Sequence, residues 1–373
     1  MITERELKMN ERMFKPQIDE DILFKCVSQQ LRRELRKLDL NWRIEILSEE
    51  VNFTTKGIYR ISGTIHNKKW SLILKILQEV EDKLDPQHHN YWKREALVLS
   101  TTILERYSKL FITPKCYHIE ENTDGTVWLW MEEIDGQFGQ SLTEENFQFI
   151  AHTLGVFNGI YLHEPNMLPS WVCRSWLDSW IKSSQHYSIQ VEDYIDLVGP
   201  DLKKMINSFL MIKKDIPHHL RMLKNSPQVL AHQDLSKGNI CISDGTLSLI
   251  DWQFMSVSAL GEDLGKLFGV MVSQEMISIK KIDTYRRLLL ENYIIGLEDS
   301  GWTGNKETLT YAFYISFALR SVWEVPKFVE SIIQGNSDEE HSRLQELVTY
   351  QLQTYNEACD MIDKKDECIN FKS

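Results

Sequence analysis

One segment, residues 230–251, constrains the fold more than any other part of the chain. It reads LAHQDLSKGNICISDGTLSLID. Asn239 follows Asp234 by five positions, inside a glycine-containing loop. Two short runs of β-forming residues come next, and the Asp-Gly pair between them favours a tight hairpin turn. Because the second run leads directly to Asp251, we expect a loop and a hairpin to bring two carboxylates and one amide together.

Two carboxylates and an amide in this order are suited to phosphoryl transfer. One carboxylate orients an attacking hydroxyl and accepts its proton, while the amide and the second carboxylate hold magnesium on nucleotide phosphates. The alternative is a surface loop with a helix-capping Asp and a turn-forming Asn. The spacing H-x-D-x-x-x-x-N alone would not decide between them, but a hairpin that ends in a second aspartate favours the phosphotransferase interpretation.

The segment resembles the catalytic and metal-binding loops of the aminoglycoside phosphotransferase (phosphotransferase enzyme) family, in the protein-kinase-like superfamily. His232-Gln233-Asp234 stands where protein kinases have His-Arg-Asp. Asp251-Trp252-Gln253 stands where they have Asp-Phe-Gly, and the missing glycine is usual in small-molecule kinases. Residues 261–265, Gly-Glu-Asp-Leu-Gly, match a further family pattern of a glycine followed by Asp-Leu.

The resemblance implies a role for each of these polar residues. Asp234 would be the catalytic residue, and Asn239 and Asp251 would bind the metal. His232 would support the catalytic loop. Asp263, which we expect to cap the next helix, would support the same loop by bonding back to it.

The resemblance also implies the architecture, an α+β fold with two lobes. A small N-lobe built on an antiparallel sheet would precede a larger helical C-lobe. We therefore predict three parts: a helical N-terminal extension over residues 1–42, an N-lobe over 43–134 that carries the nucleotide-binding hairpin and hinge, and a C-lobe over 135–373 with the catalytic loop, metal loop and acceptor site.

The hairpin predicted for residues 43–65 would carry the phosphates at its tip. In a kinase fold, backbone N–H groups of such a tip bond the phosphates. Thr54, Thr55 and Gly57 are the expected contacts, since antibiotic kinases often have hydroxyl residues here. The chain has no G-x-G-x-x-G at this place, and any hairpin can carry threonine and glycine.

A single lysine interrupts the apolar run WSLILKIL at residues 70–77. A lysine in a buried strand needs a partner. Resemblance to kinases makes Lys75 the contact of the α- and β-phosphates, and makes Glu95, on the next predicted helix, the carboxylate that holds it. The alternative is a lysine at a sheet edge whose amine reaches solvent.

Residues 127–136 read as a strand followed by a turn, which resembles the hinge between kinase lobes. A hinge binds adenine through backbone groups, so side-chain identity has little influence there. By the family pattern the contacts are at Glu132 and Ile134, with Met131 lining the pocket. A simple surface turn is the other interpretation.

Bulk composition limits the possible partners. The formal net charge is −12, so no nucleic-acid surface is expected. The chain has no apolar run of 18 residues, which argues against a membrane span. Six scattered cysteines without a C-x-x-C pair favour free thiols in a reducing cytoplasm.

The sequence gives less information about the residues that bind the acceptor. Residues 137–373 carry most of the negative charge, and the segment after Ala358 contains Asp360, Asp363, Asp366 and Glu367. Either these carboxylates favour a cationic, amine-bearing acceptor, as in antibiotic kinases, or they are solvated surface. Trp176 and Trp180 share one helical face, and either belong to the core or stack on a sugar.

These features together predict a cytoplasmic enzyme that transfers the γ-phosphoryl group of ATP, or of GTP, to a hydroxyl of a small molecule with Mg2+. Two alternatives are a catalytically silent nucleotide-binding protein of the same fold and a protein kinase. The absence of Asp-Phe-Gly and of a recognisable Ala-Pro-Glu argues against the protein kinase.

Overall fold

The computed structural model describes residues 16–34, 41–52, 54–165, 167–335 and 338–370. The chain forms two compact units. The sheet unit comprises residues 1–84, 96–101 and 114–134, and the helical unit comprises residues 85–95, 102–113 and 135–373.

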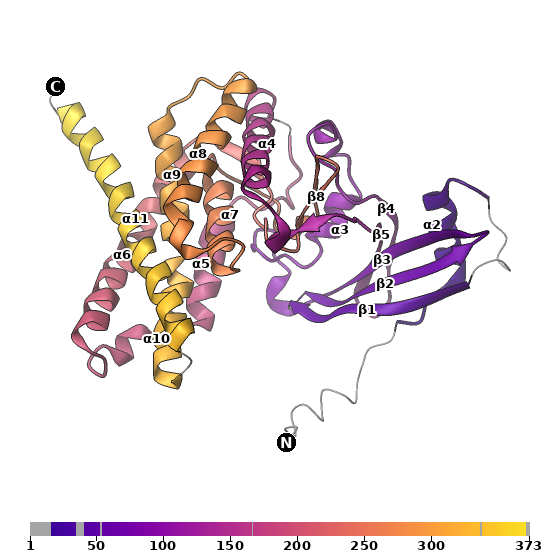
Figure 1. The fold of residues 1–373 in the computed structure, drawn as a ribbon, viewed down its shortest axis with the longest axis horizontal. Coiled ribbons are helices and arrows are strands. Elements are labelled where there is room, and N and C mark those ends of the chain that lie inside the picture. Colours follow the sequence, from indigo (N-terminus) through magenta and orange to yellow (C-terminus); the bar gives the residue numbers. More distant parts are fainter. Residues whose placement is uncertain (1–15, 35–40, 53, 166, 336–337, 371–373) are drawn as a thin grey trace. The chain divides into compact units, whose positions relative to one another are not determined.

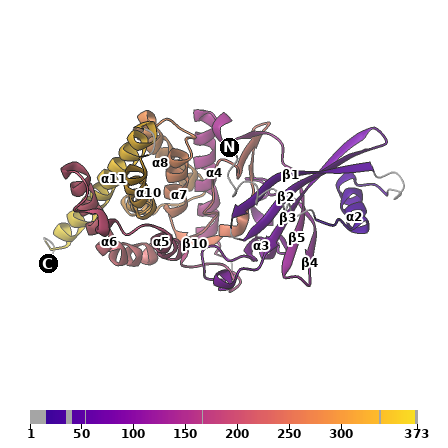
Figure 2. The ribbon, with the colours of Figure 1, turned by 90° about the horizontal axis from the view of Figure 1, so that it is seen from below.

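An antiparallel sheet in the order β1-β2-β3-β5-β4 forms the sheet unit (Figures 1 and 2). Its strands are β1 (Asn41–Asn52), β2 (Thr55–Ile65), β3 (Lys68–Gln78), β4 (Cys116–Glu121) and β5 (Thr126–Glu132). Residues of β2 alternate between buried and partly exposed, which follows from the two-residue period of a strand. Tyr59 and Ile61 are therefore buried in the core, while Arg60 faces the other side.

Helix α2 (Glu20–Leu31) packs on the apolar face of this sheet. Leu23, Cys26 and Val27 recur at helical spacing, and all three are fully buried. The helix ends where Arg32 adopts a left-handed conformation with φ of 50°.

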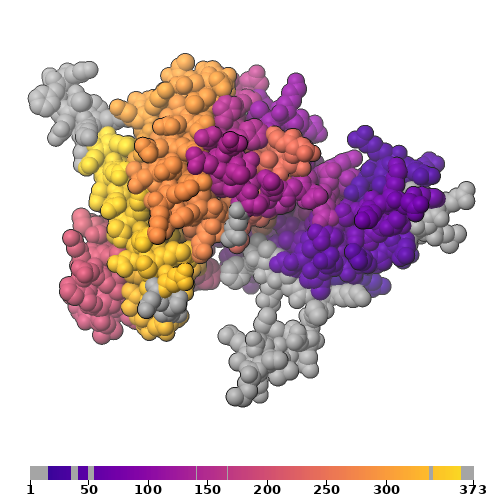
Figure 3. Space-filling model, viewed as in Figure 1, coloured from indigo at the N-terminus to yellow at the C-terminus, as the bar shows by residue number. Residues whose placement is uncertain are grey.

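Long helices build the helical unit: α4 (Glu144–His163), α5 (Trp176–Tyr187), α6 (Pro200–Asn225), α7 (Glu262–Ser273), α8 (Ile282–Asp299), α9 (Lys306–Ala318), α10 (Ser321–Gln334) and α11 (Asp338–Asn370). Helices α4 and α8 cross where Gly155 faces the backbone of Tyr293 and Gly296 faces that of His152. A Cβ at either glycine would clash, so glycine permits this close approach. In the space-filling view, α10 and α11 (yellow) lie beside α8 and α9 (orange) (Figure 3).

Short strands in the helical unit carry the loops of interest. β7 (Gln228–Ala231) pairs with β10 (Ser256–Ala259), and β6 (Gln137–Phe138) pairs with the hairpin of β8 (Ile240–Ser243) and β9 (Thr246–Leu249). The hairpin turn is Asp244-Gly245, with φ of 48° and 72°. Positive φ at both positions matches the Asp-Gly signal in the sequence.

The predicted α+β architecture of an antiparallel sheet followed by a helical region is confirmed. Two helix boundaries differ from the sequence patterns. α3 (Arg94–Leu99) ends early because the hydroxyls of Ser100 and Thr101 bond the carbonyls of Leu97 and Val98. The apolar pattern of residues 307–325 divides into α9 and α10.

Two further sequence predictions concern the whole chain. The three-part division at residues 42 and 134 stays a prediction. Among the described residues, no helix combines the length and apolar character that crossing a membrane requires.

Candidate active site

The loop after β7 places Asp234 against Asn239. The side-chain amide of Asn239 donates to the backbone carbonyl of Asp234 and to its Oδ2, both at 2.9 Å. Because a carboxylate only accepts hydrogen bonds, the NH2 group of the amide must face it. The Oδ1 of Asn239 therefore points away from Asp234. Both side chains are partly exposed, so Asp234 is fixed in orientation yet open to solvent.

Asp251 is tied to the same loop through its neighbour Ile250. The N–H of Ile250 donates to the carbonyl of Asn239 (3.0 Å), and the carbonyl of Ile250 accepts from Nε2 of His232 (3.0 Å). Asp251 itself has φ of 60° and ψ of 73°, a left-handed conformation that non-glycine residues rarely adopt. The structure thus brings Asp234, Asn239 and Asp251 together through a continuous set of backbone and side-chain bonds.

His232 is fully buried at the centre of this set. Its Nδ1 accepts from the N–H of Asp234 at 3.2 Å, so its Nε2 carries the proton that is donated to Ile250. Burial lowers the pKa of His232 to about 4, although the charge of Asp251 opposes this shift. The ring is therefore neutral at physiological pH and joins the two loops as a donor and an acceptor.

Asp263 holds the catalytic loop from the next helix. Its carboxylate accepts from the backbone N–H groups of His232 and Gln233, both at 2.9 Å. The sequence prediction that Asp263 caps this helix is wrong. The helix begins at Glu262 with Gly261 as its N-cap, because the carboxylate of Asp263 is directed at the loop. Burial raises the pKa of Asp263 to about 6, while both backbone bonds oppose the shift.

Trp252 anchors the segment that follows Asp251. Its side chain is 1% exposed, and its ring lies 5.7 Å from that of Phe111 and 4.3 Å from that of His232. Phe157 contacts the same ring edge to face. Trp252 is therefore part of an aromatic cluster, which fixes the backbone next to Asp251.

The sheet unit places the predicted phosphate contacts on β2 and β3. Lys75 is only 3% exposed and lies in β3 between Ile58 of β2 and Leu129 of β5. Thr54, just before β2, and Thr55, its first residue, are buried, and Gly57 follows in the same strand.

The predicted hinge residues lie at the end of β5. Met131 is buried in the strand, Glu132 is its last residue and Ile134 follows it. The N–H of Glu132 donates to the carbonyl of Lys115 (2.9 Å), and the N–H of Lys115 donates to Oε2 of Glu132 (3.2 Å). The N–H of Glu132 is therefore already engaged within the sheet unit.

Glu95, the predicted partner of Lys75, is the second residue of α3. It is 3% exposed and is grouped with the helical unit, whereas Lys75 is grouped with the sheet unit. The Lys75–Glu95 pair stays a prediction.

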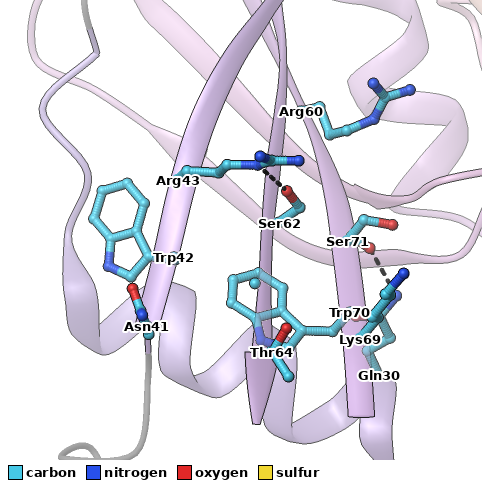
Figure 4. Close-up of a pocket in the computed structure, with 11 residues that line it drawn as sticks. Gln30, Asn41, Trp42, Arg43, Arg60, Ser62, Thr64, Lys69, Trp70 and Ser71 are labelled. Carbon is cyan, nitrogen blue, oxygen red and sulfur yellow. Dashed lines mark hydrogen bonds between the residues drawn. The ribbon is translucent and has the colours of Figure 1, made fainter. Parts of the chain in front are cut away.

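A separate concavity of about 650 Å3 lies on the polar face of the sheet (Figure 4). Arg43 reaches Ser62 across it, and Arg60 contributes its guanidinium. Arg60 is paired with Glu133 (2.6 Å) and Glu45 (3.1 Å), and these bonds raise its pKa. The positive charge of Arg60 is therefore already compensated within the sheet unit.

A comparison with known protein families identifies the family to which this chain belongs. The family model for choline/ethanolamine kinases matches residues 91–285, more than half of the chain. The chain belongs to the choline/ethanolamine kinase family. It is accordingly a small-molecule phosphotransferase with an alcohol group as acceptor. The predicted resemblance to kinases of this superfamily is confirmed.

Solved structures share the fold at low sequence identity. Amicoumacin kinase hAmiN, in complex with AMP-PNP, Ca2+ and Ami, is 13% identical, covers 94% of this chain and 96% of its own, and has a TM-score of 0.54. The choline kinase from Cryptosporidium parvum Iowa II is 15% identical, with coverages of 92% and 97% and a TM-score of 0.52. The search of curated proteins gives no significant match.

Arg94 supports the segment that follows Asp251 and was missed by sequence reasoning. Its buried guanidinium donates to the carbonyls of Pro86, His88, His89 and Gln253, at 2.7 to 2.8 Å. Burial lowers its pKa to about 10, so it stays charged. Arg94 thus ties the chain two residues after Asp251 to the loop before α3. Its only signal in the sequence is its position beside Glu95.

Asn158 is a second supporting residue that the sequence did not reveal. It is fully buried in α4, donates to the carbonyl of Leu230 (2.8 Å) and accepts from the hydroxyl of Tyr293 (2.5 Å). Leu230 belongs to β7, the strand that leads into the catalytic loop. An asparagine inside an apolar helical pattern was the available signal, because a buried amide must be hydrogen-bonded.

Proposed function

We propose that this kinase transfers the γ-phosphoryl group of ATP to a hydroxyl of a small molecule, with Asp234 as the catalytic residue. The observation that carries the proposal is the pair of bonds from Asn239 to Asp234. They hold a partly exposed carboxylate in a fixed direction without adding a charge beside it. Such a carboxylate can orient an incoming hydroxyl and accept its proton.

Asn239 and Asp251 are the residues proposed to hold Mg2+. The Oδ1 of Asn239 is turned away from Asp234, and Asp251 supplies a carboxylate, so both offer the oxygen ligands that magnesium prefers. When bound, the metal would neutralise charge on the nucleotide phosphates. The similar amicoumacin kinase contains AMP-PNP and Ca2+, a nucleotide analogue and a divalent cation, which supports the same class of cofactors here.

Residues of the sheet unit are proposed to bind the nucleotide. Lys75 would contact the α- and β-phosphates, with Glu95 holding its amine. Thr54, Thr55 and Gly57 would contribute the backbone around the phosphates. The carbonyl of Glu132 and the backbone of Ile134 would bind the base, with Met131 beside it.

The proposal is tested by screening hydroxyl compounds with ATP and Mg2+ for the mass increase of one phosphate. We expect a small-molecule product, and we expect Asp251→Ala to abolish magnesium-dependent nucleotide binding. Asp244→Ala, in the turn of the same hairpin, is the matched control because its side chain is exposed. Labelled protein bands from a lysate would instead indicate a protein kinase. Nucleotide binding without turnover of any acceptor would indicate a silent homologue.

A further inference from the structure

Helix α5 presents two parallel tryptophans beside the catalytic loop. The rings of Trp176 and Trp180 are 6.1 Å apart and differ by only 7° in plane. Trp176 is 2% exposed, while Trp180 is partly exposed. The spacing of four residues places both rings on one face of the helix.

Two cations from other helices already occupy the faces of these rings. The Nζ of Lys266, in α7, lies 4.9 Å from the ring centre of Trp176 and 5.6 Å from that of Trp180. The Cζ of Arg320, just before α10, lies 5.5 Å from Trp180. All three distances are within the range of cation–π attraction. We refer to Trp176, Trp180, Lys266 and Arg320 as the aromatic–cation surface.

Arg320 of this surface is held in place by a carboxylate. Arg320 donates to Oε1 of the buried Glu324 at 2.8 Å. Burial and the charge of Arg320 lower the pKa of Lys266 to about 8, while Asp234, Glu324 and Asp263 oppose the shift. Lys266 is therefore charged at neutral pH. Gln233, the residue before Asp234, lines the same small cavity as Lys266, so the ammonium lies beside the loop that carries the proposed catalytic carboxylate.

The space beside this surface is small. A cavity of about 10 Å3 lies among these four side chains, Leu177, Gln233, Glu262 and Ser316. Gln233 Oε1, Ser316 Oγ and Arg320 Nε are buried and have no hydrogen-bond partner among the described residues. A cavity of this size has room for about one water molecule, which could satisfy these atoms. It has no room for a trimethylammonium group.

We propose that Lys266 determines acceptor specificity by occupying the position, against Trp176 and Trp180 and near Asp234, that the cationic head of a short amino alcohol would need. The proposal rests on the proposed role of Asp234. In choline and ethanolamine only two carbons separate the nitrogen from the hydroxyl. A hydroxyl placed at Asp234 would therefore bring a second positive charge close to Lys266, and like charges repel strongly in a partly buried site.

The acceptor class follows from this repulsion. The group next to the reacting hydroxyl is uncharged or anionic. Amines farther from the hydroxyl are not excluded, so the acidic carboxylates near the C-terminus could still attract a larger polyamine. This enzyme would thus belong to the choline/ethanolamine kinase family without acting on choline or ethanolamine.

A binding experiment tests the occupied surface without requiring turnover. Tetramethylammonium is titrated into the full-length protein while tryptophan fluorescence is recorded. We expect Lys266→Ala to bind it with a Kd at least about tenfold lower than the wild type, consistent with a cation–π contribution. The gain should disappear in Lys266→Ala/Trp180→Ala. Lys266→Arg should behave as the wild type because it restores a cation.

Lys182→Ala is the matched control. Lys182 is on the same helix, but its side chain is 72% exposed and paired with Asp178. It should leave the titration unchanged. If the folded Lys266→Ala protein binds no better than the wild type, Lys266 is not what closes the surface. If the Lys266→Ala protein does not fold, the Lys266→Gln protein is titrated in its place. Saturable binding by the wild type itself, with a change in tryptophan fluorescence, would overturn the proposal.

A turnover experiment tests the acceptor class. With ATP and Mg2+, the wild type should phosphorylate neither choline nor ethanolamine, while Lys266→Ala should raise kcat/KM for choline at least about tenfold above the wild-type detection limit. Wild-type turnover of either amino alcohol would overturn the inference while supporting the proposed function. Absence of ATP turnover with every acceptor would instead count against the proposed function. The binding experiment would still test whether Lys266 closes the aromatic–cation surface.

Discussion

The catalytic loop and the aromatic–cation surface lie in the same helical unit but are assembled in different ways. The loop is held mainly by bonds within residues 232–251, with Asp263 shortly after them. The aromatic–cation surface takes its side chains from α5, α7 and the start of α10. The first is a nearly continuous stretch of chain, whereas the second exists only where separate helices pack.

The difference concerns what each region contributes to the reaction. The loop would provide chemistry common to phosphotransferases, and its geometry depends on short-range backbone bonds. The aromatic–cation surface would decide which acceptor is accepted, and its charge depends on packing. Membership of the choline/ethanolamine kinase family therefore accounts for the reaction class but does not identify the acceptor, which we propose depends on Lys266.

The largest loss of activity is expected from substitution of Asp234, the proposed catalytic residue of the loop. Asp234→Asn should lower kcat by about 10²–10⁴ while leaving nucleotide affinity nearly unchanged, because it removes the proton acceptor but keeps the shape. Steady-state kinetics and a nucleotide titration measure both quantities. Asp244→Asn, an exposed aspartate ten residues later, is the control. Undiminished turnover in Asp234→Asn would remove this residue from the mechanism.

The next prediction concerns the sheet unit, where Lys75 is a charged residue within the apolar strand β3. Lys75→Met should fold with an unchanged Tm and lose about 10²–10³ in kcat, because it removes a single charged contact to the phosphates. Lys69→Met, near the other end of β3 and exposed, is the control. An experimental structure in which Lys75 and Glu95 lie on opposite faces of their elements would refute the pairing.

Asp263 tests whether the loop depends on a single longer-range anchor. Asp263→Asn should lower the free energy of unfolding by about 2–3 kcal/mol, because one backbone N–H would face an amide NH2 instead of a carboxylate. Urea unfolding measures the change. Asp201→Asn, an exposed acid in the first turn of α6, should change it by less than about 1 kcal/mol. Equal losses in the two variants would mean that Asp263 does not anchor the loop.

His219 shows how packing of distant helices fixes a buried polar group. It contacts the hydroxyls of Tyr311 (2.8 Å) and Tyr355 (3.0 Å), which come from α9 and α11. Burial lowers its pKa from 6.5 to about 4. Between these pH values the unfolded chain binds a proton that the folded protein does not. Stability from neutral His219 is therefore complete above pH 6.5 and is lost as the pH falls toward 4.

His219→Gln should remove this contribution to the pH dependence of stability. Urea unfolding between pH 4 and 7 should show a slope reduced by at most about 1.4 kcal/mol per pH unit, the value for one proton. His218→Gln, at the exposed neighbouring position, is the control. A slope that is the same in His219→Gln and in the wild type would show that the pKa of His219 does not differ between the folded and unfolded states.

The sequence by itself determined the parts of this protein that depend on neighbouring residues. The Asp-Gly turn, the two β-runs and the spacing of Asp234 and Asn239 predicted the hairpin and loop, because turn geometry and strand periodicity are local properties. The apolar run around Lys75 likewise predicted a buried strand. The α+β architecture followed from the resemblance that these motifs carry.

Tertiary structure alone decided the contacts between segments far apart in the chain. The bonds from Arg94 to Gln253 and from Asn158 to Leu230 join residues with no common local pattern. Lys266 lies one turn after Asp263 in a helical sequence, and only packing against α5 brings its ammonium to two tryptophan rings. The physical reason is that burial and charge at a site depend on every element that packs there, whereas a sequence pattern reports the conformation of one element at a time.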